Sequence, residues 1–170
     1  MNDILNEWTL LTYKVPNQPS RLRLQVWRKL QGMGALYLQD AVCLLPARDD
    51  LSENLHYIAQ MVEEMGGTCQ LFSASALLPD GPQQIVADFQ RLADGRLEDI
   101  LTRLDKIEGS LESAASPSGL EAAEEAMKRE RIAYLRARRL NYFGSVREME
   151  IDSRLERLRQ TLDDLHRSRK

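Results

Sequence analysis

The stretch ALYLQDAVCLL, residues 35–45, contains two short apolar runs, Ala35–Leu38 and Ala41–Leu45, that are separated only by the polar pair Gln39-Asp40. Two apolar runs with so short a polar break between them are typical of a β-hairpin. Pro46 follows the second run, and it ends the strand because proline has no backbone N–H to donate. The stretch therefore predicts two adjacent antiparallel strands.

A strand and a helix are predicted on the N-terminal side of this hairpin. The run Trp8–Val15 is rich in aromatic and β-branched residues, and it stops at the prolines of residues 16–19. Ser20 is a suitable N-cap for a helix that ends at Gly34, because apolar residues recur between them at spacings of three and four.

A helix and a strand are predicted on the C-terminal side as well. Apolar residues at helical spacing predict a helix over about 50–65, and the run Thr68–Ser73 predicts a fourth strand. The order β-α-β-β-α-β is that of a ferredoxin-like domain, in which one antiparallel sheet packs both helices on a single face. We therefore expect an α+β protein with a ferredoxin-like βαββαβ domain at residues 7–76.

The second half of the chain predicts a helical region at 80–168. Apolar periodicity predicts helices at about 82–108, 120–141 and 149–167, with a possible break at Gly95 in the first. A Ser-, Ala- and Gly-rich linker is expected at 109–119. The last helix has an apolar seam that needs a partner, either the preceding helix or a second copy of the chain; we favour the preceding helix, in an αα-hairpin.

Composition excludes several classes of protein. The chain has 170 residues with two cysteines and two histidines, and it shows no phosphate loop, nucleophile elbow or metal-ligand spacing. We expect no catalytic residue, no metal, no cofactor and no enzymatic activity. No apolar stretch approaches the length of a membrane span, and the N-terminus is acidic, so we expect a cytoplasmic protein without membrane contact. Cys43 and Cys69 lie in apolar runs and are expected to be buried, inert thiols.

Charge is segregated along the chain although the net charge is only −3. Residues 51–125 carry a net charge of −10, whereas residues 126–170 carry +6. Two basic clusters could neutralise DNA phosphates, one on the first helix and one on the helix at 120–141. The candidate DNA-binding residues are Arg21, Arg23, Arg28, Lys29, Lys128, Arg131, Arg136, Arg138 and Arg139. The alternative is a solvated helix face, although Ile132 and Leu135 lie inside the second basic arc and indicate a contact there.

Three blocks of sequence resemble a known family. They are WTLLTYKVP at 8–16, PSRLRLQVWRKL at 19–30 and GALYLQDAVCLLP at 34–46, and IVADF at 85–89 and RLNYFG at 139–144 agree with the same family. The resemblance is to the N-terminal domain of the chromate-resistance regulator ChrB and spans about residues 7 to 160. A more distant similarity, to the phenylacetate-degradation repressor and to CRISPR spacer-acquisition endoribonucleases, supports the fold. An acid ends the first strand in that nuclease family, whereas Lys14 lies there in this chain, so metal-dependent cleavage is disfavoured.

The resemblance implies a chromate-responsive, DNA-binding transcriptional regulator of chromate-resistance and efflux genes. We also expect a homodimer whose DNA partner is the operator upstream of these genes. Chromate is a tetrahedral dianion, so Arg21 and Arg28, which share a helix face, are candidate oxyanion-binding residues by chemistry; Arg23 lies off that face. The alternative is a non-enzymatic homo-oligomeric interaction module that does not bind DNA and that associates through a sheet edge or the seam of the last helix.

Overall fold

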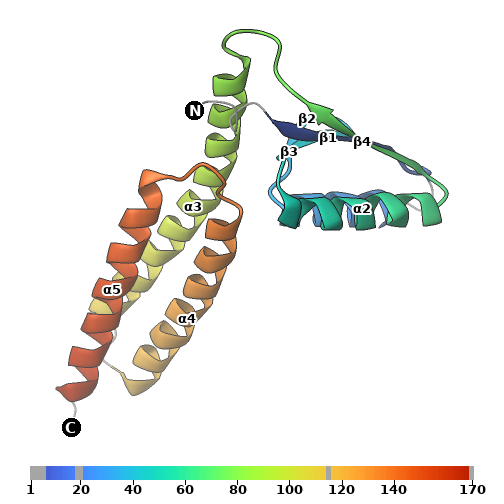
Figure 1. The fold of residues 1–170 in the computed structure, drawn as a ribbon. Coiled ribbons are helices and arrows are strands. Elements are labelled where there is room, and N and C mark those ends of the chain that lie inside the picture. The colour runs from blue at the N-terminus through green and yellow to red at the C-terminus, as the bar shows by residue number, and fades with distance from the viewer. Residues whose placement is uncertain (1–6, 18–20, 114–115, 169–170) are drawn as a thin grey trace. The chain divides into compact units, whose positions relative to one another are not determined.

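A computed structural model describes residues 7–17, 21–113 and 116–168 of the chain (Figure 1). The chain divides into two compact units, residues 1–89 and 90–170. The sequence predicts a boundary between residues 76 and 80, whereas the structure extends the first unit to Phe89. The difference arises because the ring of Phe89 stacks on Trp8 of the first strand, with centroids 5.5 Å apart and planes 10° from parallel.

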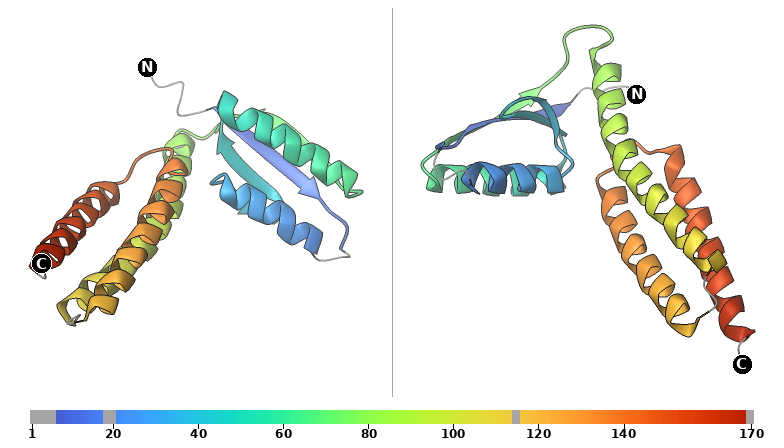
Figure 2. Two further views of the ribbon diagram at one scale, coloured as in Figure 1. Left: turned by 90° about the horizontal axis from the view of Figure 1, so that it is seen from below. Right: turned by 180° about the vertical axis from the view of Figure 1, so that it is seen from behind.

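The first unit is a four-stranded antiparallel sheet with two helices. The strand order is β2-β3-β1-β4, so the first strand occupies a central position and β2 and β4 form the edges. Both helices lie on one face of the sheet (Figure 2). The elements are β1 (Trp8–Lys14), α1 (Arg21–Gly32), β2 (Leu36–Gln39), β3 (Val42–Pro46), α2 (Asp49–Glu64) and β4 (Thr68–Ala74).

The strand register places one apolar row beneath the helices. Leu11 of β1 lies opposite Cys43 of β3 and Leu71 of β4, and side chains of directly opposed residues share a face of the sheet. Leu11 and Cys43 are fully buried, and so are Val26 and Leu30 on the inner face of α1. The predicted amphipathic helix therefore buries the predicted apolar stripe against the sheet.

The predicted hairpin is confirmed, with its turn shifted by one residue. Gln39 pairs with Val42, so Asp40 and Ala41 form the turn, and the register is irregular between Tyr37 and Gln39. Ala41 has a φ of 59°, the left-handed region that costs energy for any residue with a Cβ.

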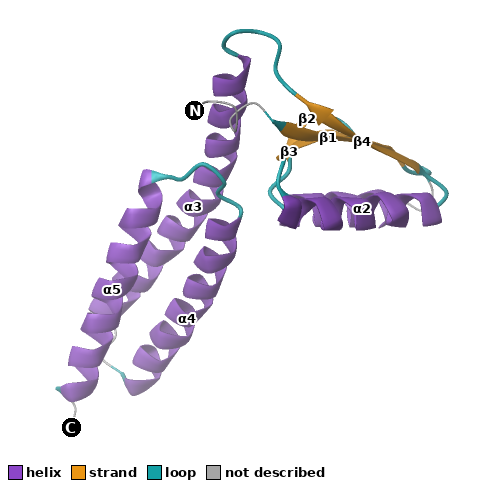
Figure 3. Ribbon diagram, in the orientation of Figure 1, coloured by secondary structure: helices purple, strands orange, loops and turns teal. Residues whose placement is uncertain are grey.

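The second unit is a bundle formed by α3, α4 and α5 (Figure 3). The helices are α3 (Gly81–Ser113), whose N-terminal part belongs to the first unit, α4 (Pro117–Arg139) and α5 (Val146–Arg167). The core draws on all three helices, with Leu97 and Leu104 from α3, Tyr134 from α4 and Ile151 from α5 nearly inaccessible to solvent. The expectation that the last two helices pack against each other is confirmed, and α3 completes the bundle.

Helix boundaries differ from the sequence prediction in three places. The helix α3 continues through Gly95 without a break, because Leu97 and the following apolar residues bury an uninterrupted stripe. The predicted linker at 109–119 is mostly helical: α3 extends to residue 113, since Leu111 is buried, and α4 begins at Pro117. Residues 114–115 of that linker lie outside the described residues. The last helix begins at Val146 rather than 149, because the Ser145 hydroxyl accepts a hydrogen bond from the Arg147 amide.

No helix within the described ranges has the length and apolar character needed to cross a bilayer.

Candidate nucleic-acid interface

The outward face of α4 carries the largest group of basic side chains in the second unit. The helix buries Ala123, Tyr134 and Ala137 against the bundle, which turns the opposite face to solvent. Ile132 and Leu135 also lie on that outward face and are 52% and 50% exposed. Apolar side chains inside a basic surface distinguish this face from an ordinary solvated helix. The exposed basic residues are Lys128, Arg129, Arg131, Arg136, Arg138 and Arg139.

Two of these cations are already paired within the protein. Lys128 contacts Glu125 at 3.3 Å and Glu124 at 3.5 Å, and the hydrogen bond with Glu125 raises the pKa of the lysine. Arg138 reaches from α4 to α5, where it lies 3.4 Å from Glu148 and 3.8 Å from Asp152. These carboxylates offset much of the positive charge that a phosphate would meet at the two positions.

Three of the predicted arginines of α4 remain available. Arg131, Arg136 and Arg139 form no salt bridge with any residue in the described part of the chain, and all three are exposed. Eight residues separate the first from the last, which is about 12 Å along the helix axis. The structure thus narrows the five predicted cations of α4 to three that form no salt bridge within the described residues.

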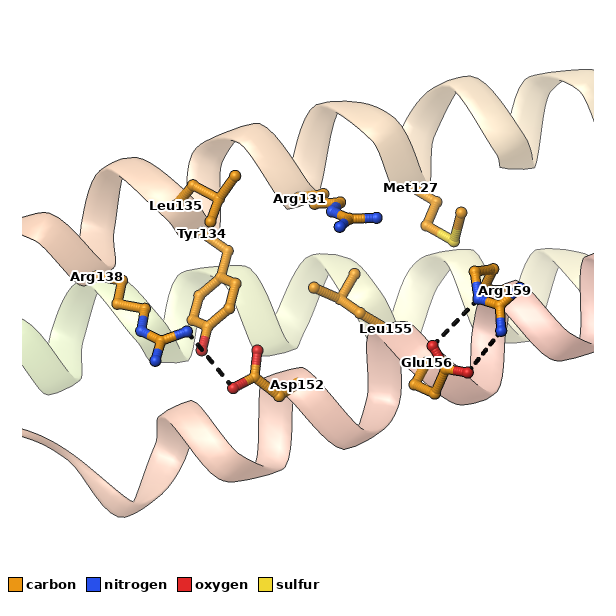
Figure 4. A pocket seen from close by; sticks show the side chains of 9 residues that line it. All are labelled: Met127, Arg131, Tyr134, Leu135, Arg138, Asp152, Leu155, Glu156 and Arg159. Carbon is orange, nitrogen blue, oxygen red and sulfur yellow. Dashed lines mark hydrogen bonds and ion pairs between the residues drawn. The ribbon is translucent and has the colours of Figure 1, made fainter.

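A groove runs between α4 and α5, and Arg131 is one of the residues that line it (Figure 4). It has a volume of about 290 Å³, and Met127, Leu135 and Leu155 give it an apolar lining. In Figure 4 Arg131 extends into the space between the two helices and is joined to none of the other side chains drawn, whereas Arg159 is held by Glu156 at 2.7 Å. The groove therefore combines apolar surface with the guanidinium of Arg131, which forms no salt bridge among the described residues but whose charge acts on the Glu156 carboxylate.

Polar contacts fix the groove at the end where α4 leads into α5. The buried Tyr134 donates its hydroxyl hydrogen to the carbonyl oxygen of Glu148, and burial raises the pKa of Tyr134 to about 12. Asn141 donates to the Glu148 carboxylate at 2.6 Å. These bonds tie the loop and the first turn of α5 to α4.

A buried arginine that the sequence analysis missed holds α5 to α3. The Arg154 side chain is 11% exposed and donates to both carboxylate oxygens of Glu108, at 3.0 and 2.5 Å, and to Asp105 at 2.5 Å. The signal was present in the spacing, since Arg154 follows Ile151 by three residues and precedes Leu158 by four. A position on the apolar seam of a helix is buried whether or not its residue is apolar.

The basic residues of α1 do not form one surface. Arg21 and Arg28 are exposed on the outer face of the helix together with Trp27, which is 45% exposed. Lys29 is partly buried, and its ammonium group lies 5.0 Å from the ring centroid of Tyr57 in α2, a cation–π contact. Arg23, on a different side of α1, donates to Asn17 at 2.7 Å.

The two candidate oxyanion-binding residues, Arg21 and Arg28, share a face of α1 but are two turns apart. Seven residues correspond to about 10.5 Å along the helix axis, which is more than the width of one tetrahedral ion. Both side chains would have to bend toward each other to hold the same ion.

The two thiols are poor nucleophiles in this environment. Cys43 is buried, and loss of solvent raises its pKa to about 12. Burial also raises the pKa of the half-buried Cys69. Within the residues that the structure describes, no three His, Cys, Asp or Glu side chains come together in a group that could hold a metal ion.

The fold and the charged surfaces define an α+β protein in which a sheet unit is joined to a helical bundle with an arginine-rich face. Residues 23–168 match the family described as Protein ChrB, N-terminal, so the chain belongs to that family. This match confirms the resemblance seen in the sequence. No curated protein matches the chain.

Proposed function

We propose that the chain is the DNA-binding part of a ChrB-type transcriptional regulator, without enzymatic activity of its own, that acts on the operator of chromate-resistance genes and responds to chromate. Membership of the ChrB N-terminal family supports the regulatory role. The outward face of α4 supports the DNA contact, because Arg131, Arg136 and Arg139 are exposed and form no salt bridge among the described residues. The strand order β2-β3-β1-β4 with both helices on one face supports a ferredoxin-like first unit.

Unneutralised arginines are the observation that carries the DNA proposal. Each phosphate contact releases counterions from the DNA. A plot of the logarithm of the binding constant against the logarithm of the salt concentration therefore falls with a slope of about 0.9 for each contact. A helix surface with three such contacts would contribute a slope of about 2.7. Arg138 and Lys128 would contribute less, because a phosphate must compete with carboxylates that are already in place.

The test is a salt series measured by fluorescence anisotropy on the purified chain with its own upstream DNA and with scrambled DNA. Arg136→Ala and Arg139→Ala are each expected to weaken binding to both DNAs and to reduce the salt slope by about 0.9. Arg157→Ala is the matched control, because this exposed arginine lies on α5 and removes the same charge. An Arg157→Ala variant that lost as much affinity and slope as the α4 variants would refute the assignment to α4.

The chromate response is tested in the same assay. Chromate that releases the upstream DNA, where sulfate at equal concentration does not, would support a chromate-responsive regulator. Sulfate is the stringent control, because chromate and sulfate are both tetrahedral dianions. Equal release by both anions would be an ionic-strength effect and would count against chromate sensing.

A homo-oligomeric interaction module is the second candidate, and the edge strand β4 favours it. This strand pairs only with β1, and its sequence TCQLFSA contains neither a charged residue nor a proline. Natural edge strands usually carry such residues to prevent pairing with another chain. Light scattering after size-exclusion chromatography would detect a dimer, which is also expected of the regulator; a dimer that binds no DNA at low salt would favour the interaction module.

A further inference from the structure

A polar pocket lies in the first unit, where the C-terminal end of β1 meets the turn between β2 and β3. It has a volume of about 330 Å³, and all its lining residues belong to the first unit. Most of its lining is polar or charged, and both signs of charge are present. The lining residues that matter here are Tyr13, Lys14, Asn17, Arg23, Tyr37 and Asp40.

Two tyrosine hydroxyls face each other in this pocket. The hydroxyl oxygens of Tyr13 and Tyr37 are 3.1 Å apart, and both side chains are partly buried. One hydroxyl donates to the other, so the pair consumes one of its two hydrogens. Among the described residues neither hydroxyl has another hydrogen-bond partner. The pair thus leaves one O–H donor for whatever occupies the pocket.

A guanidinium is held at the same place. Arg23 donates to the Asn17 side chain at 2.7 Å, which restrains its orientation, and its other N–H groups have no hydrogen-bond partner among the residues that the structure describes. Its positive charge acts on the Tyr13 hydroxyl, and so does the negative charge of Asp40. Arg23 and Lys14 give the pocket two cations against the single carboxylate of Asp40.

The tyrosines remain donors at ordinary pH. Burial raises the pKa of Tyr37 well above that of a free tyrosine, and burial also raises that of Tyr13. Neither hydroxyl therefore becomes an anion under physiological conditions, and each keeps its hydrogen.

We propose that this pocket binds a phosphate group. An oxygen-rich anion accepts hydrogen bonds from a tyrosine hydroxyl and a guanidinium at once, and charge-assisted bonds to arginine are the strong ones. A neutral ligand would form no ionic interaction with Arg23 or Lys14. The phosphate could be free in solution or part of a DNA backbone, and the experiment separates these sources.

The test is an NMR titration of the full chain with sodium phosphate, with sodium chloride at equal ionic strength as the reference. We expect saturable shifts at the Tyr37 and Ala41 amides. Either hydroxyl of the pair can serve as the donor, so both are removed in Tyr13→Phe/Tyr37→Phe. That variant should bind phosphate at least about tenfold more weakly, the effect of losing a hydrogen bond to an anion. Removing both partners of a hydrogen bond is close to neutral for stability, so the variant should fold.

Two further variants make the test specific. Tyr57→Phe removes an exposed hydroxyl from α2 and should leave phosphate binding unchanged. Asp40→Asn removes the carboxylate and should tighten phosphate binding about threefold, the effect of one like charge at several ångströms in a solvated site. Weaker binding in Asp40→Asn would show that the pocket prefers a cation and would overturn the proposal, as would shifts that never saturate or that chloride reproduces.

A measurement of duplex DNA binding by the same double variant completes the test. A loss of duplex affinity in Tyr13→Phe/Tyr37→Phe, parallel to the loss of phosphate binding, would support a backbone phosphate as the occupant. Unchanged duplex affinity with lost phosphate binding would support a free phosphate. The titration with inorganic phosphate contains no DNA, so a failure of the proposed DNA-binding function would leave this result intact.

Discussion

Replacing Arg154 by methionine tests how the helical bundle is held together. Arg154 lies on the seam of α5 with 11% of its side chain exposed, and its three hydrogen bonds go to Glu108 and Asp105 on α3. These two carboxylates raise the pKa of the guanidinium, so it stays charged. Methionine preserves much of the apolar stem but offers no donor.

The expected loss of stability depends on how well water solvates Glu108 and Asp105 once the arginine is removed. A hydrogen bond to a charged group contributes about 1.5 to 3 kcal/mol when its partners are withdrawn from water. The Glu108 and Asp105 side chains are 38% and 66% exposed, so both regain water when the arginine is removed, and most of the nominal loss is recovered. We expect Arg154→Met to lower the free energy of unfolding by about 2 kcal/mol.

Urea denaturation followed by circular dichroism at 222 nm measures the effect. With a slope of about 2 kcal/mol/M, the transition should move down by about 1 M. Arg157→Met makes the same chemical change at an exposed position of the same helix and should shift the free energy by less than about 0.5 kcal/mol. Fluorescence of Trp8 and Trp27 reports whether the first unit stays folded. Equal shifts in the two variants would refute the reasoning.

Three other predictions concern backbone and thiol positions. Gly95→Ala should raise the free energy of unfolding by about 1 kcal/mol, because Gly95 lies inside α3 and an added Cβ meets no atom within 4 Å; a lower urea midpoint would contradict it. Cys43 has a pKa of about 12 in the folded protein against about 9 for a free thiol, so the unfolded chain loses this proton first as pH rises. Its contribution to stability is complete below pH 9 and disappears toward pH 12, and Cys43→Ala should flatten that alkaline decline in urea midpoints; an unchanged decline would refute the assignment. In native protein a thiol reagent should label Cys69 before Cys43.

Local patterns in the sequence predicted most of the secondary structure. The stripe from Leu51 to Met65 and the apolar runs around Asp40 correspond to α2 and the hairpin, because burial of one face imposes its period on the residues. The linker prediction was wrong where composition and burial disagree. Gly109 and Ser110 resemble a loop, yet Leu111 continues the apolar stripe of α3, and its burial keeps the helix intact.

Long-range polar contacts were beyond the sequence. Arg138 has the same local signature as Arg139, but α5 places carboxylates beside Arg138 alone of the two. Tyr13 and Tyr37 are 24 residues apart, and only the sheet brings their hydroxyls together. Two arginines that look alike in the sequence of one helix therefore differ in their salt bridges, because the neighbouring helix supplies carboxylates to one of them.

The uninterrupted course of α3 limits how the chain can be divided. Most domains are joined by exposed linkers, which proteases cut and which evolution uses for recombination. Here the boundary after Phe89 falls within a helix, where successive turns share one ladder of backbone hydrogen bonds. A cut at that point would leave four unsatisfied carbonyls on one fragment and four unsatisfied amides on the other. Limited proteolysis should therefore not separate the two units at their boundary. Evolution should also keep the two units together in one chain.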